Sequence, residues 1–237
     1  MIKRIFKIAL RVILWFLGLS VALVILYRFV PPPVTPLMVI RVFEQSFDEK
    51  REVRLYKDWV SIDEMSPSMP LAVITSEDQK FEEHFGFDLE AIEKAQKYNE
   101  RHKGKKVKGA STISQQTAKN VFLWPQRSYI RKGFEVYFTF LIELLWSKER
   151  IMEVYLNVIE MGDGVYGAEA AAQQYFGKKA ANLTEGEAAL IAACLPNPIR
   201  WSPARPSRYI QRKKQWIVRH MHMVGKPGFT VEENEKK

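Results

Sequence analysis

Cysteine is nearly absent from this sequence of 237 residues, in which Cys194 is the single example. One cysteine excludes an intramolecular disulfide and a zinc site built from cysteine ligands. The composition is not extreme either, because 47% of the residues are hydrophobic and 27% are charged. These proportions are typical of a globular chain and argue against wholesale disorder, a collagen-like fibre or a coiled coil. Cys194 lies in an apolar segment and is predicted to be a small core residue.

Acidic residues are missing or scarce in three segments, although the chain carries 27 of them against 36 Lys and Arg. Residues 1–28 hold five basic residues and no acid, residues 95–132 hold ten and one acid, and residues 200–221 hold seven and none. The net charge of +9 suits three kinds of partner: nucleic acid, an anionic membrane surface or a phosphorylated substrate. The block at 200–221 is only loosely explained, by the membrane surface.

Charge of either sign is absent from residues 12–27, and apolar residues extend this run on both sides. A helix of about 20 apolar residues crosses the hydrocarbon core of a membrane. The alternative is a cleaved signal peptide, whose apolar region is usually about 7–15 residues and is followed by small residues. Tyr27, Arg28 and a run of prolines follow instead, so we expect an uncleaved anchor. Basic residues before it predict a cytoplasmic N-terminus and an extracytoplasmic domain, where nucleic acid is no expected partner.

Signals for strands are rare, so the rest of the chain is predicted to be mostly α-helical. We expect an anchor with its cytoplasmic tip at 1–30, a linker and membrane-proximal segment at 31–69, the folded domain at 70–223 and a flexible tail at 224–237. Apolar periodicity and turn residues predict several helices within the domain; they cover 129–146, 148–159, 168–176, 188–195 and 207–223.

Glu77 is unusual within the helix predicted from Pro70 onward. It falls on an apolar stripe at three- and four-residue spacing; the stripe comprises Leu71, Ile74, Phe81 and Phe85. A buried Arg or Lys is one explanation for an acid in this position. A catalytic carboxylate whose pKa is raised by desolvation is the other. Spacing alone does not decide between them.

A second polar cluster follows further along the chain. Ser111 or Thr112 is expected to cap a helix that runs to about Phe122. Four polar side chains recur on this helix and form either a cradle for an anion or sugar or a solvated face; they are Gln115, Gln116, Lys119 and Asn120. Beyond it, Arg131 lies four residues before Glu135, so an ion pair is the simplest interpretation of these two.

Taken in order, these segments resemble glycosyltransferase family 51, the polymerising domain of peptidoglycan synthesis. The similarity covers about residues 71–221, and its specificity comes from four motifs in one order; they span Glu77 to Asp88, Gly109 to Asn120, Arg131 to Glu135 and Lys148 to Asn157. The short length, the anchor and the absence of Ser-x-x-Lys and Lys-Thr-Gly motifs make the chain similar to the monofunctional members, which do not cross-link glycans.

The resemblance implies a lysozyme-like helical glycosyltransferase domain, preceded by one transmembrane helix, at the bacterial plasma membrane. The donor would be a glycan strand on undecaprenyl pyrophosphate, and the 4-hydroxyl of lipid II would attack its anomeric carbon. A β-1,4 link forms with inversion, and the lipid pyrophosphate leaves. The implied partners are lipid II, the lipid-linked strand and membrane lipids, with cell-wall synthesis or division proteins as further candidates. A divalent cation, Mg²⁺ or Mn²⁺, stays an option, and no metal ligand is assigned.

By motif position, Glu77 matches the family's general base and Glu135 its second carboxylate. Inverting enzymes usually hold two carboxylates about 6.5–9.5 Å apart, so we expect these two to lie within or slightly beyond that range across one cleft. Lys119 and Arg127 match the family's pyrophosphate contacts. Six further residues are expected to bind substrate or to form the cleft wall: Ser111, Thr112, Gln115, Gln116, Asn120 and Arg131.

Two other functions compete with this interpretation. One is a lysozyme-like hydrolase of the same polymer, because the family fold is itself similar to lysozyme. Lytic enzymes of that type typically place Ser directly after the catalytic Glu, whereas Asp78 follows Glu77 here, and they need no cradle for a lipid pyrophosphate. The other is a non-catalytic membrane scaffold whose basic segments bind anionic lipid.

Overall fold

The fold is built mainly from helices, which confirms the predicted class. The computed structural model describes residues 2–49, 52–103, 107–126, 128–225 and 227–230. The helices are α1 (Ile2–Phe29), α2 (Pro36–Ser46), α3 (Ser68–Glu77), α4 (Leu89–Arg101), α5 (Ile113–Phe122), α6 (Tyr129–Leu145), α7 (Lys148–Val158), α8 (Ala168–Phe176), α9 (Glu185–Cys194) and α10 (Arg208–Val224). Three short strands form one sheet in the order β1 (Tyr56–Lys57), β3 (Val165–Tyr166), β2 (Glu160–Gly162).

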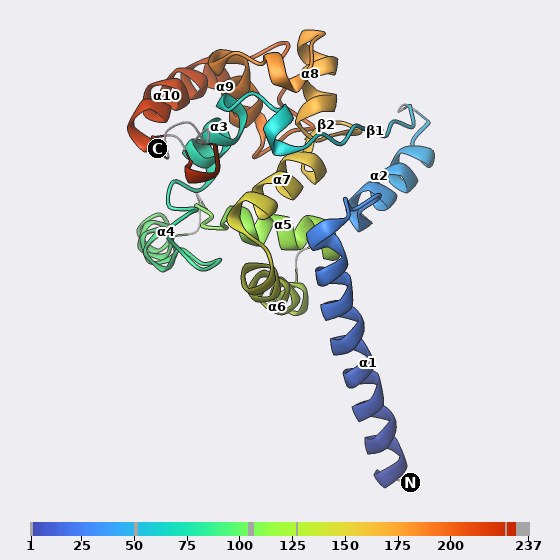
Figure 1. The fold of residues 1–237 in the computed structure, drawn as a ribbon. Helices are drawn as coiled ribbons and strands as arrows, with labels where there is room; N and C mark the ends of the chain where they lie inside the picture. Colours follow the sequence, from blue (N-terminus) through green and yellow to red (C-terminus); the bar gives the residue numbers. More distant parts are fainter. Residues whose placement is uncertain (1, 50–51, 104–106, 127, 226, 231–237) are drawn as a thin grey trace, which may run out of the picture.

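Helix α1 is long and apolar enough to span a membrane. It has 28 residues, and its most apolar window reaches a mean hydropathy of 2.5. Its N-terminal part projects away from the other elements (Figure 1), and its buried residues are Ser20 and Val24. There, the Ser20 hydroxyl lies 2.7 Å from the Tyr137 hydroxyl of α6, and the Trp146 indole donates to the Val24 carbonyl over 2.8 Å. The second half of α1 is therefore fixed to the helical domain.

Two groups of helices form the core. Helix α5 packs between α6 and α7, whereas α3 packs on α9 and α10. Figure 1 shows α7 between the upper group and α6, with α10 at the end of the molecule opposite the free end of α1. The largest fully buried side chains include Tyr155 of α7, Tyr166 of β3 and Phe81, which follows α3. This core connects the two groups and holds the facing ends of α3 and α5.

Polar residues directly before several helices fix where those helices begin. Thr112 and Thr184 each accept from a backbone N–H of the first turn and form capping boxes with Gln115 and Glu187. Such reciprocal bonds satisfy backbone groups that have no partner within the helix. Ser207 caps α10 in the same way, through the N–H of Ile210. The cap predicted at Ser111 or Thr112 is therefore confirmed at Thr112.

One side chain and one close contact between backbone segments fix the chain around the small sheet. The Asn157 side chain accepts from the Val60 N–H over 3.0 Å and donates to the Val60 carbonyl over 2.9 Å, so it pairs like a strand residue. Gly167 directly precedes α8 with φ of 85°, and a Cβ there would come within 2.9 Å of the Asn157 carbonyl oxygen. This position therefore requires glycine for both its conformation and its space.

The helix predicted from Pro70 to Phe85 is shorter than expected. It begins at Ser68 and ends at Glu77, so Pro70 lies within its first turn, where the missing N–H has no helical partner to lose. Phe81 is buried in the turns that follow and Phe85 is exposed, so the apolar stripe was not one continuous helical face. The helix ends because the side chain of the next residue, Asp78, is engaged by α5.

Three further segments complete the fold. The segment 41–56 holds the end of α2 and the first residue of β1. Within the predicted flexible tail, Gly228–Thr230 form a 3₁₀ turn, and the Gly228 N–H donates to Glu82. The basic block at 200–221 includes most of α10, which lies far from the free end of α1 (Figure 1).

Candidate active site

Glu77 lies where two cavities meet. It is the last residue of α3, its side chain is partly buried, and it lines both cavities. The first cavity, of about 380 Å³, is bounded by α2, α5 and the segments after α7 and α9; we call it the α2 cavity. The second, of about 910 Å³, lies between the end of α3, α4, residues 107–112 and α10; we call it the α10 cavity. Ligands bound in the two cavities would therefore meet at the Glu77 carboxylate.

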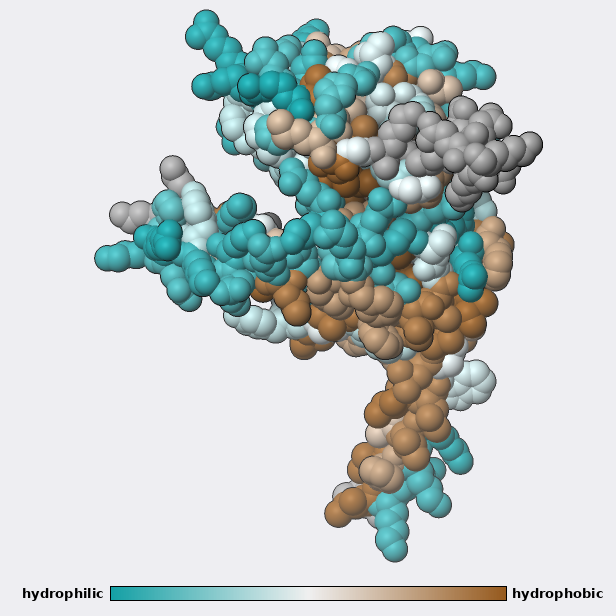
Figure 2. Space-filling view, turned by 60° about the vertical axis from the view of Figure 1, so that its left-hand side comes forward, coloured by the Kyte–Doolittle hydropathy of each residue, from teal (hydrophilic) through white to brown (hydrophobic). Residues whose placement is uncertain are grey.

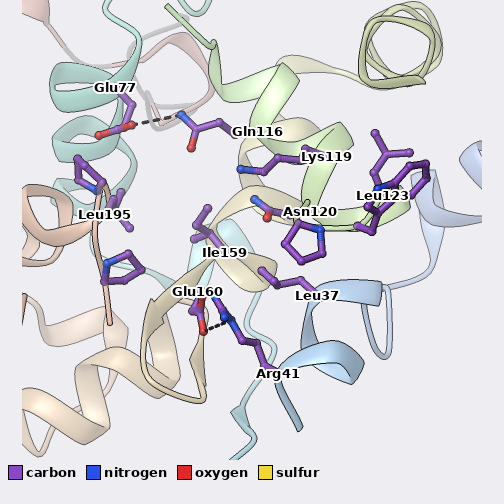
Figure 3. A pocket seen from close by; sticks show the side chains of 14 residues that line it. Leu37, Arg41, Glu77, Gln116, Lys119, Asn120, Leu123, Ile159, Glu160 and Leu195 are labelled. Atoms are coloured by element: carbon purple, nitrogen blue, oxygen red, sulfur yellow. Dashed lines mark hydrogen bonds and ion pairs between the residues drawn. The ribbon is translucent and has the colours of Figure 1, made fainter. Parts of the chain in front are cut away.

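Gln116 holds the Glu77 carboxylate from the opposite side of the junction. Its Nε2 donates to Glu77 Oε2 over 3.2 Å, a bond drawn in Figure 3. Its Oε1 accepts from the hydroxyl of Tyr155 over 3.3 Å, and Tyr155 is fully buried. The tyrosine therefore orients the amide so that its N–H group, not its oxygen, faces the carboxylate.

The residue after Glu77 ties α3 to α5. The Asp78 carboxylate accepts from the Ile113 N–H over 3.0 Å, and His84 Nε2 lies 2.9 Å from the same carboxylate. Ile113 is the first residue of α5, where backbone N–H groups are free and the helix dipole favours a negative charge. This contact sets the end of α3 against the start of α5, which brings Glu77 within reach of Gln116.

A buried ion pair supports this arrangement from below. Glu143 of α6 accepts from the Ser114 hydroxyl and from Lys148 Nζ, the latter over 2.8 Å. Lys148 also donates to the His84 carbonyl over 2.6 Å and lies over the Phe81 ring. The loop after α3 is therefore fixed to α5, α6 and α7 by polar contacts.

The α2 cavity presents polar groups from α5 to an occupant. Lys119 and Asn120 line it next to Gln116, and Figure 3 shows these side chains extending from α5 into the space between Glu77 and Ile159. Asn120 is buried, and its Nδ2 has no hydrogen-bond partner in the described structure. A buried donor without a partner is costly, so this amide is suited to a polar ligand. All three residues lie on one helix, as the sequence predicted.

The far wall of the α2 cavity carries an ion pair that the sequence did not indicate. Arg41 of α2 and Glu160 of β2 lie with Nε and Oε1 3.3 Å apart, and both line the cavity (Figure 3). Burial raises the pKa of Glu160, and the Arg41 charge partly opposes this rise. The two residues are separated by more than a hundred positions, so no local spacing pointed to them.

The α10 cavity includes two of the predicted site residues. Ser111 and Thr112 line it beside Glu77 and Gln116. Lys213 of α10 lines it as well, although sequence analysis treated this lysine only as part of a basic block. Burial lowers the pKa of Lys213, and the nearby Glu77 charge partly offsets that effect. The available sequence signal for Lys213 was its position on one face of the helix predicted at 207–223.

Two of the predicted binding residues also hold each other and the start of α5 in place. Gln115 is buried, and its Oε1 accepts from the Thr112 N–H over 3.0 Å. In return, Thr112 Oγ1 accepts from the Gln115 N–H, and the Thr112 hydroxyl donates to the Gly86 carbonyl over 2.7 Å. Gln115 does not line either cavity, so its direct contact with substrate stays a prediction, whereas its role in capping α5 is observed.

Glu135 is engaged by its own helix. Its Oε2 accepts from Arg131 over 2.6 Å, and its Oε1 accepts from Lys132. Glu135 is buried, and neither it nor Arg131 is among the residues that line the two cavities. The predicted ion pair is present with both basic neighbours. The paired catalytic assignment of Glu77 and Glu135, with its separation, stays a prediction.

Two further expectations receive no support from the geometry. Arg127, predicted to contact a pyrophosphate, lies outside the described residues. Within the part of the chain that the structure describes, no group of three or more His, Cys, Asp or Glu residues is arranged to hold a metal ion. The described residues therefore offer no ligand set for the divalent cation that the sequence left open.

Comparison with known proteins identifies a family for almost the whole chain. The profile of a family described as Transglycosylase matches residues 44–222. The chain is 57% identical over 225 residues to the "Biosynthetic peptidoglycan transglycosylase" of Bacteroides thetaiotaomicron, covering 95% of this chain and 90% of that one. A protein of the same description from Bdellovibrio bacteriovorus is 57% identical over 212 residues, 90% of this chain and 84% of its own. One from Pseudomonas fluorescens is 49% identical over 237 residues, which cover 100% of this chain and 98% of that one.

Proposed function

Because the chain belongs to the transglycosylase family of peptidoglycan biosynthesis, we propose that it polymerises lipid II into β-1,4 glycan strands with release of undecaprenyl pyrophosphate. The family makes it an enzyme that extends glycan strands. The identity of both substrates, the inversion at the donor and the residue roles below are our proposals. They rest on the geometry around Glu77 and on the motifs that this chain carries.

The observation that carries the proposal is the position of Glu77 at the junction of two cavities. A transglycosylase joins two lipid-linked sugars, so it needs one site for the donor and another for the acceptor. The general base must reach the acceptor hydroxyl at the point where the two meet. Glu77 lines both cavities, and Gln116 holds its carboxylate there.

In the proposed reaction, the 4-hydroxyl of lipid II gives its proton to a Glu77 oxygen as its own oxygen attacks the donor's anomeric carbon. The bond between that carbon and the pyrophosphate oxygen breaks, and its electron pair leaves with the lipid pyrophosphate. Attack from the face opposite the leaving group inverts the α-linked donor to a β-linked product. The hydrogen bond from Gln116 Nε2 holds the carboxylate that accepts the proton in place.

The departing pyrophosphate needs positive charge and donors. Lys119 lines the α2 cavity beside Asn120, whose buried Nδ2 lacks a protein partner. We assign these two to the pyrophosphate side of the site, together with Arg127 from the sequence motif. Lys213 approaches Glu77 from the α10 cavity and supplies a second positive charge near the carboxylate.

The apolar surface supports action at a membrane. Helix α1 is the candidate anchor. Figure 2 shows brown, hydrophobic surface continuing from α1 onto the adjoining underside of the domain. Helix α6 packs on α1 and exposes several large apolar residues, and exposed Phe85 lies beside one of them, Phe140; the exposed residues of α6 are Tyr129, Ile130, Val136, Phe140 and Leu144. We propose a single-pass protein of the plasma membrane, with a cytoplasmic N-terminus and its α6 side against the outer leaflet.

The chain provides no machinery for cross-linking the strands. Neither the Ser-x-x-Lys nor the Lys-Thr-Gly motif of penicillin-binding enzymes occurs in the sequence. We therefore propose glycan polymerisation without transpeptidase activity.

The test is polymerisation of purified lipid II by the full-length protein and by Glu77→Gln, with and without a chelator. We expect glycan polymer from the wild type and a loss of several orders of magnitude in the variant, because the amide keeps the size of the carboxylate but cannot take the proton. Glu83→Gln, an exposed acid in the following turns, is the matched control. Soluble fragments released from finished cell wall, without polymer from lipid II, would instead establish the hydrolase.

A further inference from the structure

One face of α10 carries two exposed aromatic rings above the α10 cavity. Tyr209, Lys213 and Trp216 lie at four- and three-residue steps, so they share one side of the helix. All three line the cavity that reaches Glu77. Tyr209 is 54% exposed and Trp216 is 38% exposed, although large aromatic rings are usually covered in a folded domain.

Each ring is held by an aromatic neighbour on one side. The ring centroids of Trp201 and Tyr209 are 5.5 Å apart, and those of Trp216 and His220 are 4.1 Å apart in a stacked arrangement. These contacts fix the planes of the rings without covering them, because both rings keep substantial exposed area. Fixed, exposed rings provide flat contact area at a low cost in conformational entropy.

This face lies away from the candidate membrane helix. Helix α10 lies at the end of the molecule opposite the free end of α1 (Figure 1). The cavity below it extends between α3, α4 and α10 to Glu77, and its volume of about 910 Å³ is near the upper limit for ligand pockets. A hydrophilic arm formed by α4 borders the hollow in Figure 2. The cavity is therefore large, polar along one wall and aromatic along the other.

A glycan strand fits this combination. The C–H groups of a pyranose ring are slightly positive and pack against the negative face of an aromatic ring. Strand hydroxyls and stem-peptide carboxylates would face the polar wall, where Lys108 lines the cavity and Lys80 and Lys94 are paired with Glu90. Under the proposed function the strand grows at its pyrophosphate end, so its older sugars must move away from the membrane, toward α10.

We propose that Tyr209 and Trp216 form a carbohydrate-binding stripe that holds the older part of the growing strand. The stripe keeps the product attached between additions and so sets strand length. This inference rests on the proposed function and adds a product site to it. Lys213 shares this face of α10 and lines the same cavity as Glu77, so it marks where the product site joins the reaction centre.

The experiment compares strand lengths made from labelled lipid II at equal lipid II consumption. For Trp216→Ala and Tyr209→Ala we expect mean strand length to fall about fivefold, with a smaller fall in the rate of consumption. Trp216→Phe, which keeps an aromatic face, should restore most of the length. Gln211→Ala lies on the opposite side of α10 and should leave both quantities unchanged. Lengths that stay equal in both alanine variants, or that the phenylalanine does not restore, would overturn the stripe.

A binding measurement separates this proposal from the proposed function. Chitotetraose, a β-1,4 tetramer of N-acetylglucosamine, is titrated onto the full-length protein and onto the Tyr209→Ala/Trp216→Ala double variant. We expect at least fivefold weaker binding by the double variant. Equal sugar binding by the two proteins would overturn the stripe. A double variant that binds phosphatidylglycerol vesicles more weakly but binds the sugar equally well would also overturn it. A wild type that binds the sugar through these rings but makes no polymer would contradict the proposed function and leave the stripe standing.

Discussion

The side-chain amide of Gln116 donates to the Glu77 carboxylate over 3.2 Å and in turn accepts from the buried hydroxyl of Tyr155. Two helices and a tyrosine from a third therefore fix the group that we assign as the base. Orientation matters here because a base displaced by a fraction of an ångström transfers a proton less efficiently.

Removal of the Tyr155 hydroxyl tests this relay. We expect Tyr155→Phe to lower the turnover of lipid II roughly fivefold, which corresponds to the loss of about 1 kcal/mol from one hydrogen bond. Tyr166→Phe is the control, since Tyr166 is equally buried but makes neither of these hydrogen bonds. An unchanged turnover of lipid II in Tyr155→Phe would remove the tyrosine from the relay.

The alkaline side of the pH profile should depend on Lys213. Burial lowers the pKa of this ammonium, so it loses its proton at a lower pH than an exposed lysine does. We expect activity to fall as Lys213 becomes neutral, and Lys213→Arg to move that fall to higher pH because a guanidinium stays charged. Lys214→Arg serves as the neighbouring control. The same alkaline limb in wild type and Lys213→Arg would show that the charge of Lys213 is not required.

The buried pair of Glu143 and Lys148 should contribute strongly to stability. Glu143→Ala leaves Lys148 without its carboxylate and Ser114 without its acceptor. We expect the free energy of unfolding to fall by roughly 3 kcal/mol, measured by denaturant titration in detergent. The double variant Glu143→Ala/Lys148→Met should regain part of this loss. Glu93→Ala breaks the exposed pair with Lys97 and should change stability by less than about 0.5 kcal/mol. Similar losses at positions 143 and 93 would contradict the prediction.

Gly167 should not tolerate a side chain. Its φ is 85°, and an added Cβ would meet the Asn157 backbone at 2.9 Å. Gly177 has a φ of 65° but open space around the same position. Gly177→Ala should therefore show only the conformational penalty of roughly 1–2 kcal/mol, and Gly167→Ala a clearly larger loss in thermal unfolding. Equal losses would mean that the contact with Asn157 relaxes freely.

Cys194 should be chemically inert in the folded protein. The thiol is buried on α9, and burial raises its pKa to about 11. Because the thiolate is the reactive form, iodoacetamide at pH 8 should leave the native protein unlabelled and label it after denaturation. Rapid labelling of native protein, followed by mass spectrometry, would contradict the buried placement.

Local features of the chain could be predicted because they depend on neighbouring residues. The apolar run predicted α1, the polar residues at 111–112 predicted the start of α5, and the polar spacing on α5 placed Gln116, Lys119 and Asn120 together. The length of α3 could not be predicted in the same way. Its end depends on Asp78, whose carboxylate binds the first N–H of α5, 35 residues later.

The sequence by itself determined the candidate membrane helix, the mostly helical class, the helix caps and the family motifs that single out Glu77, because each follows from residue type and short spacing. Only the tertiary structure decided that Glu77 meets Gln116 at the junction of two cavities, that Arg41 pairs with Glu160, and that α10 lines the cavity that reaches Glu77. These relationships join residues far apart in the chain. They are set by how helices pack into one core, and no local period encodes that packing.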